Sequence, residues 1–281
     1  MFRKRGKRLV SDPVGACIYC GSNEALTLEH IAPYALGGTF ELPRASCKPC
    51  AKITAKFEGV VAREMLLEFR TKFKSPTRRP KERPNVLDVK GYFKETPRRI
   101  TLKPEDHLAA FCLPDLSPPT IRTGRILAKG ELHQEMGFWQ WPHPSVIDAF
   151  SRSLPDTIDR FHIGSVSINA FVRLLAKMAH AFTTAYRGRH GFIPLLLPLI
   201  LGETNEYARY VGGRSRKAPA PESGDFSFQT YTRMISGYPY VGCEIEIFPL
   251  LGAPTYDVIV GHDLKPATVS QQHEVHLFTE P

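Results

Sequence analysis

The chain has 281 residues, 42% of them hydrophobic, and a formal net charge of +9 at pH 7. This length allows two domains, the larger of which can bury a core. The longest apolar run, residues 192–201, is short and contains two prolines, so the sequence predicts no transmembrane span and no membrane partner. The basic N-terminus lacks an apolar segment typical of a secretory signal, and isolated thiols suit a reducing compartment, so we predict a cytoplasmic protein.

Near the N-terminus, four of the six cysteines form two C-x2-C pairs. Thiolates at this spacing typically bind zinc in a closed tetrahedral site, which stabilises a small module with little core of its own. Two coincidental pairs of buried thiols are the alternative, but two such pairs in one short stretch favour a metal. The sequence therefore predicts a structural zinc ion held by Cys17, Cys20, Cys47 and Cys50.

An acidic residue stands next to a histidine between the two pairs, Glu29-His30. Hydrolysis of a phosphodiester needs a base that deprotonates water and a cation that neutralises charge on the phosphoryl oxygens. Histidine titrates near neutral pH and glutamate offers the hard oxygen that magnesium prefers. Adjacent side chains on a strand point to opposite faces, so both serve one site only where the strand is irregular or the metal lies at its end. The alternative is a zinc-ribbon histidine that hydrogen-bonds a loop.

The segment 17–58 resembles the HNH nucleases of the ββα-metal superfamily, in the form with a four-cysteine zinc. The resemblance implies two strands that hold the acid–histidine pair, followed by a helix. It also implies that His30 is the general base and Glu29 a ligand of a catalytic Mg²⁺ or Mn²⁺ ion. The matching features, besides the cysteine pairs, are Leu26-Thr27-x-Glu29-His30-Ile31-x-Pro33 and Leu36-Gly37-Gly38.

The sequence departs from this family at its second metal ligand. An asparagine or histidine normally follows the fourth cysteine directly or one turn later, but Ala51 and Ala55 stand there and neither can bind a metal. On a helix over residues 51–73, Thr54 and Glu58 lie on the same side as Ala51. Glu58 starts about 10 Å further along the axis, so it could reach the metal through a bound water, or it could be a solvated acid.

Positive charge is concentrated in two blocks: residues 1–8 carry +5 and residues 70–103 carry +9. Such blocks can neutralise phosphates without reading a base sequence, and a solvated basic linker is the alternative. Beside an HNH-like module we favour phosphate contact, with DNA as the first choice of partner. The predicted nucleic-acid-binding residues are Arg3, Lys4, Arg5, Lys7, Arg8, Arg78, Arg79, Lys81 and Arg83.

Proline and charge patterns divide the chain into three parts. Residues 1–73 contain the zinc module and end in the helix predicted over 51–73. Residues 74–100 contain four prolines among basic residues and are predicted to form an extended basic linker, with one short strand around Leu87. Residues 101–281 have a globular composition and predict a C-terminal α+β domain, so the predicted fold class is α+β.

The clearest helix of the C-terminal part is predicted over Ser167–Arg187, with one apolar face. Alternation over Val241–Ile247 predicts a half-buried strand, and Thr255–Gly261 and His273–Phe278 are predicted to be further strands. We interpret the polar stripe of the helix as its solvent-exposed face, the alternative being a second phosphate-contacting surface. That stripe consists of Asn169, Arg173, Lys177, His180, Thr184 and Arg187.

These observations predict a metal-dependent endonuclease that hydrolyses DNA phosphodiester bonds, with structural zinc and catalytic Mg²⁺ or Mn²⁺. The alternative is a nucleic-acid-binding protein that retains the zinc-stapled scaffold but is catalytically impaired, because Ala51 replaces a ligand. In a third interpretation the zinc module binds other proteins and the C-terminal domain carries the function. The basic blocks favour the first two.

Overall fold

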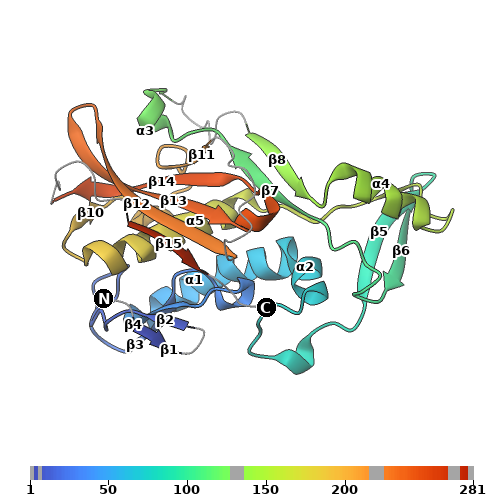
Figure 1. Ribbon diagram of the computed structural model, residues 1–281, viewed down its shortest axis with the longest axis horizontal. Helices are drawn as coiled ribbons and strands as arrows, with labels where there is room; N and C mark the ends of the chain where they lie inside the picture. Colours follow the sequence, from blue (N-terminus) through green and yellow to red (C-terminus); the bar gives the residue numbers. More distant parts are fainter. Residues whose placement is uncertain (1–2, 6–7, 127–135, 215–224, 265–272, 278–281) are drawn as a thin grey trace.

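A long helix, α5 (Ile168–Arg187), lies at the centre of the fold, between the largest sheet and α1 (Lys48–Val60) (Figure 1). The helix begins after Ser167, whose hydroxyl accepts a hydrogen bond from the backbone N–H of Ala170. The predicted helix is confirmed, and the fold is of the mixed α+β class. The computed structural model describes residues 3–5, 8–126, 136–214, 225–264 and 273–277.

The polar stripe of α5 is not the solvent-exposed face that the sequence predicted. Lys177, His180 and Thr184 are buried, because the N-terminal part of the chain covers this side of the helix while the large sheet covers the other. The Nε2 atom of His180, for example, lies 2.7 Å from the carbonyl oxygen of Ile18. A helix that is covered on two sides needs buried partners for its polar residues.

The largest sheet is antiparallel, with strand order β10-β14-β13-β12-β15, and β11 also pairs with β14. The three predicted strands are confirmed as β13, β14 and β15, but residues 241–247 are buried on both faces. Their acidic residues have partners, since Glu244 forms an ion pair with Arg214 and Glu246 accepts a hydrogen bond from the Thr255 hydroxyl. The strands are β10 (Phe192–Pro194), β11 (Val211–Arg214), β12 (Phe226–Ile235), β13 (Tyr238–Ile247), β14 (Thr255–Asp263) and β15 (His273–Leu277).

The N-terminal sheet has the order β1-β2-β4-β3, and β3 pairs antiparallel with β4. A short turn, η1 (Tyr34–Leu36), follows β3 and leads into Gly37-Gly38. Gly37 has a φ of 94°, and a Cβ atom on Gly38 would lie 2.1 Å from the Ala32 carbonyl oxygen, so the turn requires both glycines. The strands are β1 (Arg3–Arg5), β2 (Arg8–Val10), β3 (Leu26–His30) and β4 (Phe40–Cys47).

The helix predicted over residues 51–73 begins earlier and is interrupted. α1 starts at Lys48, with Pro49 in its first turn, where a missing N–H costs nothing. A wider π-type turn, η2 (Val61–Met65), then separates α1 from α2 (Leu67–Lys72). The apolar pattern continues through this turn, which is why the sequence indicated one helix.

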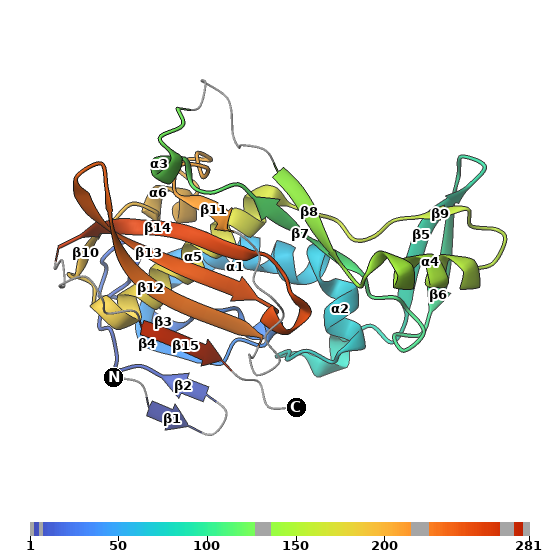
Figure 2. The ribbon, with the colours of Figure 1, turned by 45° about the horizontal axis from the view of Figure 1, so that its top comes forward.

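The second half of the segment 74–100, for which the sequence predicted an extended linker with one short strand, forms two strands. β5 (Leu87–Phe93) and β6 (Thr96–Leu102) form an antiparallel hairpin, and β9 (Arg160–Phe161) adds a third strand. Before the hairpin the chain is extended apart from one turn, η3 (Pro80–Glu82). With α4 (Pro144–Ser153) the hairpin makes an arm that projects from the body of the molecule (Figure 2).

Buried apolar side chains connect the N-terminal part with the large sheet through α5. The rings of Phe40 and Phe182 are 6.0 Å apart, and those of Phe182 and Phe228 are 4.9 Å apart. Within the described residues, no helix is long and apolar enough to cross a bilayer. The remaining elements are β7 (Phe111–Leu116), which pairs with β8 (Met136–Trp141), and α3 (Thr120–Thr123), α6 (Leu197–Leu201) and η4 (Pro249–Leu251).

Candidate zinc site and basic cleft

The four cysteines of the two C-x2-C pairs come together as predicted. Their sulfur atoms all lie within 4.8 Å of one another, and Cys20 Sγ is 3.6 Å from Cys47 Sγ. Cys17 and Cys20 lie in a tight loop in which the Cys17 N–H donates to the Ser22 carbonyl oxygen, Cys47 ends β4, and Cys50 lies in the first turn of α1. Four soft sulfur donors in one cluster could hold a zinc ion, and they would leave no open coordination position.

The surroundings of the cysteines shift their pKa values in different directions. Burial raises the pKa of the Cys17 and Cys50 thiols, whereas a backbone hydrogen bond from Ser22 lowers the pKa of the exposed Cys20 thiol. The buried thiols are therefore protonated in the absence of an ion, and a metal that binds them would release their protons. Within the described ranges, this is the one group of three or more Cys, His, Asp or Glu side chains close enough to share an ion.

The second centre is built around Lys177 of α5, whose side chain is 0% exposed. Its ammonium group lies 2.7 Å from Glu29 Oε1 and 2.9 Å from Glu58 Oε1. It also donates to two backbone carbonyl oxygens, that of His30 and that of Ile31, the latter at 3.2 Å. Lys177 thus joins β3, the loop after it, α1 and α5 at one point.

The two carboxylates keep the Lys177 side chain charged although it is buried. Burial by itself would lower the pKa of Lys177, but the Glu29 and Glu58 carboxylates outweigh it and hold that pKa above its usual value. Burial also raises the pKa of Glu29, with Lys177 opposing the rise. The charged lysine therefore gives the buried Glu29 carboxylate a partner and also contacts the Glu58 carboxylate, which is partly exposed.

Glu58 is neither a fully solvated acid nor remote from Glu29. Its side chain is 24% exposed and leans from α1 toward Lys177, as the direction of helical side chains implies. Thr54, on the same side of α1, is buried and donates its hydroxyl to the Ala51 carbonyl oxygen at 3.2 Å. Because the Lys177 ammonium lies between the two carboxylates, Glu29 and Glu58 do not fit a catalytic divalent ion as they are arranged.

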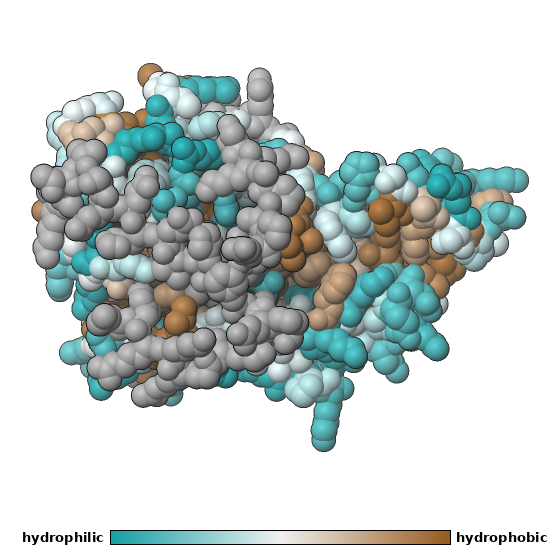
Figure 3. Space-filling model, viewed as in Figure 1, coloured by the Kyte–Doolittle hydropathy of each residue, from teal (hydrophilic) through white to brown (hydrophobic). Residues whose placement is uncertain are grey.

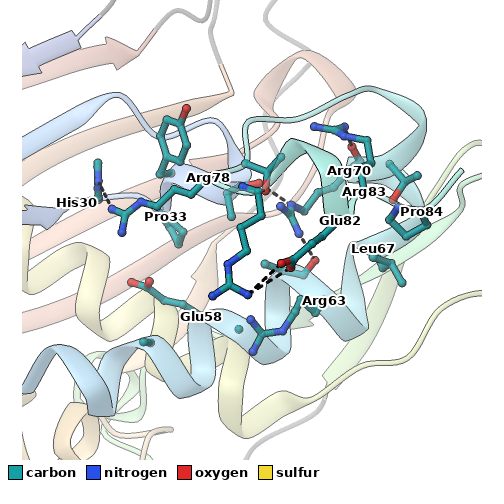
Figure 4. A pocket seen from close by; sticks show the side chains of 18 residues that line it. His30, Pro33, Glu58, Arg63, Leu67, Arg70, Arg78, Glu82, Arg83 and Pro84 are labelled. Carbon is teal, nitrogen blue, oxygen red and sulfur yellow. Dashed lines mark hydrogen bonds and ion pairs between the residues drawn. The ribbon is translucent and has the colours of Figure 1, made fainter.

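His30 has different surroundings from Glu29, as the alternation of side chains on a strand requires. Its imidazole lines a cleft, with Nε2 3.5 Å from Arg78 Nη2 and Nδ1 4.0 Å from Glu41 Oε1 (Figure 4). A guanidinium only donates, so Nε2 is the acceptor nitrogen and Nδ1 carries the proton. Glu41 is also paired with Arg8, at 2.9 Å.

Burial is the largest cause that lowers the pKa of His30, to about 4, and the positive charges of Lys177, Arg78 and Arg8 lower it further. At neutral pH the ring is therefore uncharged, and the lone pair of Nε2 can accept a proton. A histidine general base has to be uncharged before it acts, but a pKa of about 4 makes this imidazole a weak base at neutral pH.

The cleft has a volume of about 730 Å³ and lies between the helical run α1–η2–α2 and the segment 77–84. Figure 4 shows the arginine side chains converging on it from both walls, with His30 at one end. In Figure 3, hydrophilic side chains cover the edge of the molecule over the turn that connects α2 with β5. The charged side chains that line the cleft are Glu58, Arg63, Arg70, Arg78, Arg79, Glu82 and Arg83.

These arginines have two kinds of surroundings. Arg63, Arg78 and Arg79 are exposed, and Arg79 pairs with Glu82 at 3.2 Å. Arg70 is largely buried and donates to the carbonyl oxygens of Ala35 and Ala62, at 2.6 and 2.8 Å. Arg83 donates to the carbonyl oxygens of Arg70 and Ser75, so it holds the wall of the cleft in place.

The predicted phosphate-contacting residues are only partly brought together. Arg78, Arg79 and Arg83 line the cleft, and Lys81 is exposed on η3 beside it without being part of the lining. Arg8 lies near His30 through Glu41, whereas β1 places the backbone of Arg3, Lys4 and Arg5 at the outer edge of the N-terminal sheet. Lys7 lies outside the described residues.

Sequence reasoning did not assign Arg63 or Arg70 to this region, and it interpreted Lys177 as part of the solvent-exposed face of its helix. Arg63 stands outside both basic blocks. The neighbours of Lys177 (Ala176, Met178 and Ala179) are apolar, and this signal could have indicated a buried lysine.

Comparison of the chain with protein-family models, with curated proteins and with solved structures gave no match. The chemistry of the two centres therefore has to be argued from their own residues.

Proposed function

We propose that the protein binds nucleic acid, and that its basic cleft contacts the phosphate backbone. The observation that carries this proposal is the charge of the cleft lining. Five arginines and two glutamates line it; Glu82 pairs with Arg79, and Glu58 shares the Lys177 ammonium with Glu29. Guanidinium groups donate paired hydrogen bonds to phosphate oxygens, so a lining with surplus guanidinium suits a polyanion.

Arg63 and Arg78 are the cleft residues best suited to phosphate contact. Both are exposed, and among the described residues no carboxylate lies within ion-pair distance of either one. Arg79 can exchange Glu82 for a phosphate, because an exposed ion pair is worth little. Lys81, which is exposed on η3, and Arg8, which pairs with Glu41 near His30, add positive charge outside the cleft lining.

The resemblance of residues 17–58 to the HNH nucleases supports a nucleic acid as the polyanion, with DNA first. In this proposal the zinc ion is structural, held by the four cysteines. The module and its basic cleft then form a scaffold for the phosphate backbone that does not read base edges.

The test is the salt dependence of binding, measured by fluorescence anisotropy with labelled single-stranded DNA, duplex DNA and RNA between about 50 and 200 mM salt. The logarithm of the binding constant falls linearly with the logarithm of the salt concentration. For duplex DNA, each lost phosphate contact makes this fall less steep by about 0.9. The triple variant Arg63→Gln/Arg78→Gln/Arg79→Gln should therefore show a clearly smaller slope. Arg152→Gln, an exposed arginine on α4, is the matched control. Equal slopes for the triple variant and the wild type would contradict the proposal.

One observation favours a second candidate function, phosphodiester hydrolysis with His30 as the general base. The ring is uncharged at neutral pH, its acceptor Nε2 lines the cleft, and Arg78 lies beside it. With Arg78 turned from Nε2 to a phosphoryl oxygen, Nε2 would take a proton from a water molecule as the water oxygen attacks phosphorus. The bond from phosphorus to the leaving oxygen would break, and that oxygen would take a proton from the imidazolium or from solvent. We assign no step to a divalent ion, because Lys177 lies between the two candidate carboxylates. The magnesium- or manganese-dependent reaction stays a prediction.

A plasmid-nicking assay separates the two candidates. Zinc-loaded protein is incubated with supercoiled DNA in buffer without divalent ions, with Mg²⁺ and with Mn²⁺. If His30 is the base, His30→Ala should lose on the order of 10²–10⁴-fold in rate while its DNA affinity and zinc content stay unchanged. Wild-type protein that nicks under none of these conditions would leave binding as the function.

A further inference from the structure

The Lys177 ammonium group lies in a cage of oxygen atoms of the kind that usually surrounds a metal ion. Two of the four oxygens belong to carboxylates, Glu29 at 2.7 Å and Glu58 at 2.9 Å, and two are backbone carbonyl oxygens of His30 and Ile31. Carboxylate and carbonyl oxygens are the ligands of hard divalent cations such as Mg²⁺, Mn²⁺ and Ca²⁺. The cage therefore has the ligand composition of a metal site, but the cation that it holds is the Lys177 ammonium group.

The partners in this cage come from distant parts of the chain and are mostly buried, which distinguishes the cage from a surface ion pair. Glu29 comes from β3 and Glu58 from α1, both in the N-terminal part, whereas Lys177 lies on α5, more than a hundred residues later. Side-chain exposure is 0% for Lys177 and 6% for Glu29, so a divalent ion could not keep hydration water on that side. Ala51 and Ala55, on the same side of α1, offer no further ligand.

We propose that the Lys177 ammonium takes the place of a divalent cation in the native protein, so that Glu29 and Glu58 bind no Mg²⁺ or Mn²⁺ while it is present. A metal ion could enter only if the ammonium left, and a displaced lysine would then be buried in a packed helix interface without its carboxylate partners. If the lysine charge is removed, two carboxylates and two carbonyl oxygens remain directed at one point, so the cage could then bind a metal ion. This inference concerns cation binding and does not depend on whether the cleft binds nucleic acid.

The experiment measures Mn²⁺ binding to zinc-loaded, full-length protein by electron paramagnetic resonance of free Mn²⁺ and by calorimetry. Wild-type protein should show only weak, nonspecific binding. Lys177→Ala should gain one Mn²⁺ site per chain with an affinity at least about tenfold above that background. Adding Glu58→Gln to Lys177→Ala should remove the site, since one carboxylate is lost. Lys56→Ala, an exposed lysine on α1, is the matched control and should behave as the wild type.

Two results would overturn the proposal. The first is a specific Mn²⁺ site in the wild type that Glu58→Gln abolishes, because the metal and the ammonium would then coexist or exchange. The second is a folded Lys177→Ala variant without a specific Mn²⁺ site, because the oxygen cage would then not be a cation site.

Lys177→Ala leaves two carboxylates without their cation, so its melting temperature is also measured with and without Mn²⁺. Recovery of a folded state by Mn²⁺, but not by the same concentration of KCl, supports the proposal, because metal binding then replaces the lost charge. If the variant folds in neither buffer, the wild-type protein provides the test. A wild-type melting temperature that Mg²⁺ and Mn²⁺ leave unchanged supports the proposal. A rise that Glu58→Gln abolishes overturns it.

Discussion

The Nη2 atom of Arg78 lies 3.5 Å from the Nε2 atom of His30, although 48 residues separate them in the chain. The contact connects the acid–histidine motif of the N-terminal sheet with the basic segment that forms one wall of the cleft. A positive charge at this distance disfavours the protonated imidazole.

The first prediction concerns the protonation of His30. Arg78→Gln should raise its pKa, because one of the neighbouring positive charges is lost. The pKa should still stay below the ordinary value of about 6.5, since burial is the largest cause of the shift. NMR titration of the imidazole carbon-bound protons measures this. Arg79→Gln is the control, because Arg79 pairs with Glu82 instead. A pKa that is the same in all three proteins would show that the contact does not form in solution.

The second prediction concerns zinc. The purified protein should hold one zinc ion per chain, and Cys47→Ser should release it and unfold the N-terminal part, because metal binding and folding are coupled in such sites. Elemental analysis and circular dichroism measure the two effects. Cys112→Ser, at a half-buried cysteine outside the cluster, should keep the zinc. Well-folded wild-type protein without zinc would overturn the prediction.

The third prediction distinguishes Arg83 from Lys81, both of which the sequence analysis predicted to contact phosphate. Arg83→Gln should lower the free energy of unfolding by about 1–3 kcal/mol, because the guanidinium holds two backbone carbonyl oxygens of the cleft wall. Lys81→Gln should leave stability nearly unchanged, since its side chain is exposed on η3. Urea unfolding of both variants measures the difference. Similar losses in the two proteins would be evidence against a structural role for Arg83.

The fourth prediction concerns pH. Burial lowers the pKa of His180 to about 4, while the unfolded chain has the ordinary value of about 6.5. Below pH 6.5 the unfolded state therefore binds a proton that the folded state does not, so stability is complete above pH 6.5 and falls as the pH drops toward 4. The loss for this residue is about 3 kcal/mol at pH 4.

His180→Gln keeps a hydrogen-bond donor for the Ile18 carbonyl oxygen and removes the titration. Its free energy of unfolding should therefore depend less steeply on pH than that of the wild type over the range from 6.5 to 4. The comparison is made at equal zinc content, because the cysteines also bind protons. Parallel pH profiles of the two proteins would show that the pKa of His180 is the same in the folded and unfolded states.

The sequence was sufficient where a pattern is local. The spacing of the cysteines predicted the cluster, and apolar periodicity predicted α5 and three strands of the large sheet. The sequence was insufficient where the burial of a residue depends on segments that lie far away in the chain. The spacing of Lys177 and His180 shows that they share one side of a helix, but not that α1 and the N-terminal loop cover that side. An amphipathic pattern has the same period whether its polar face meets water or buried carboxylates.

The arm illustrates a second limit. Its third strand is only Arg160–Phe161, far from the hairpin in sequence, and its turn uses Lys94 and Glu95 at positive φ in place of the usual asparagine and glycine. Neither feature leaves a local signal. The prolines around residues 76–84 do mark an extended segment, but the alternation that follows them was too short to distinguish a strand from a charged linker.

The sequence separation between Glu58 and Lys177 has a consequence for synthesis of the chain on the ribosome. At about 5–20 residues per second, Lys177 is made about 6–24 s after Glu58. The cysteine cluster is complete by residue 50, so zinc can bind well before α5 exists. During that interval the growing chain carries its two glutamates without their lysine. The nascent protein therefore passes through a period in which an ion from the cell could neutralise them, until the arrival of α5 ends it.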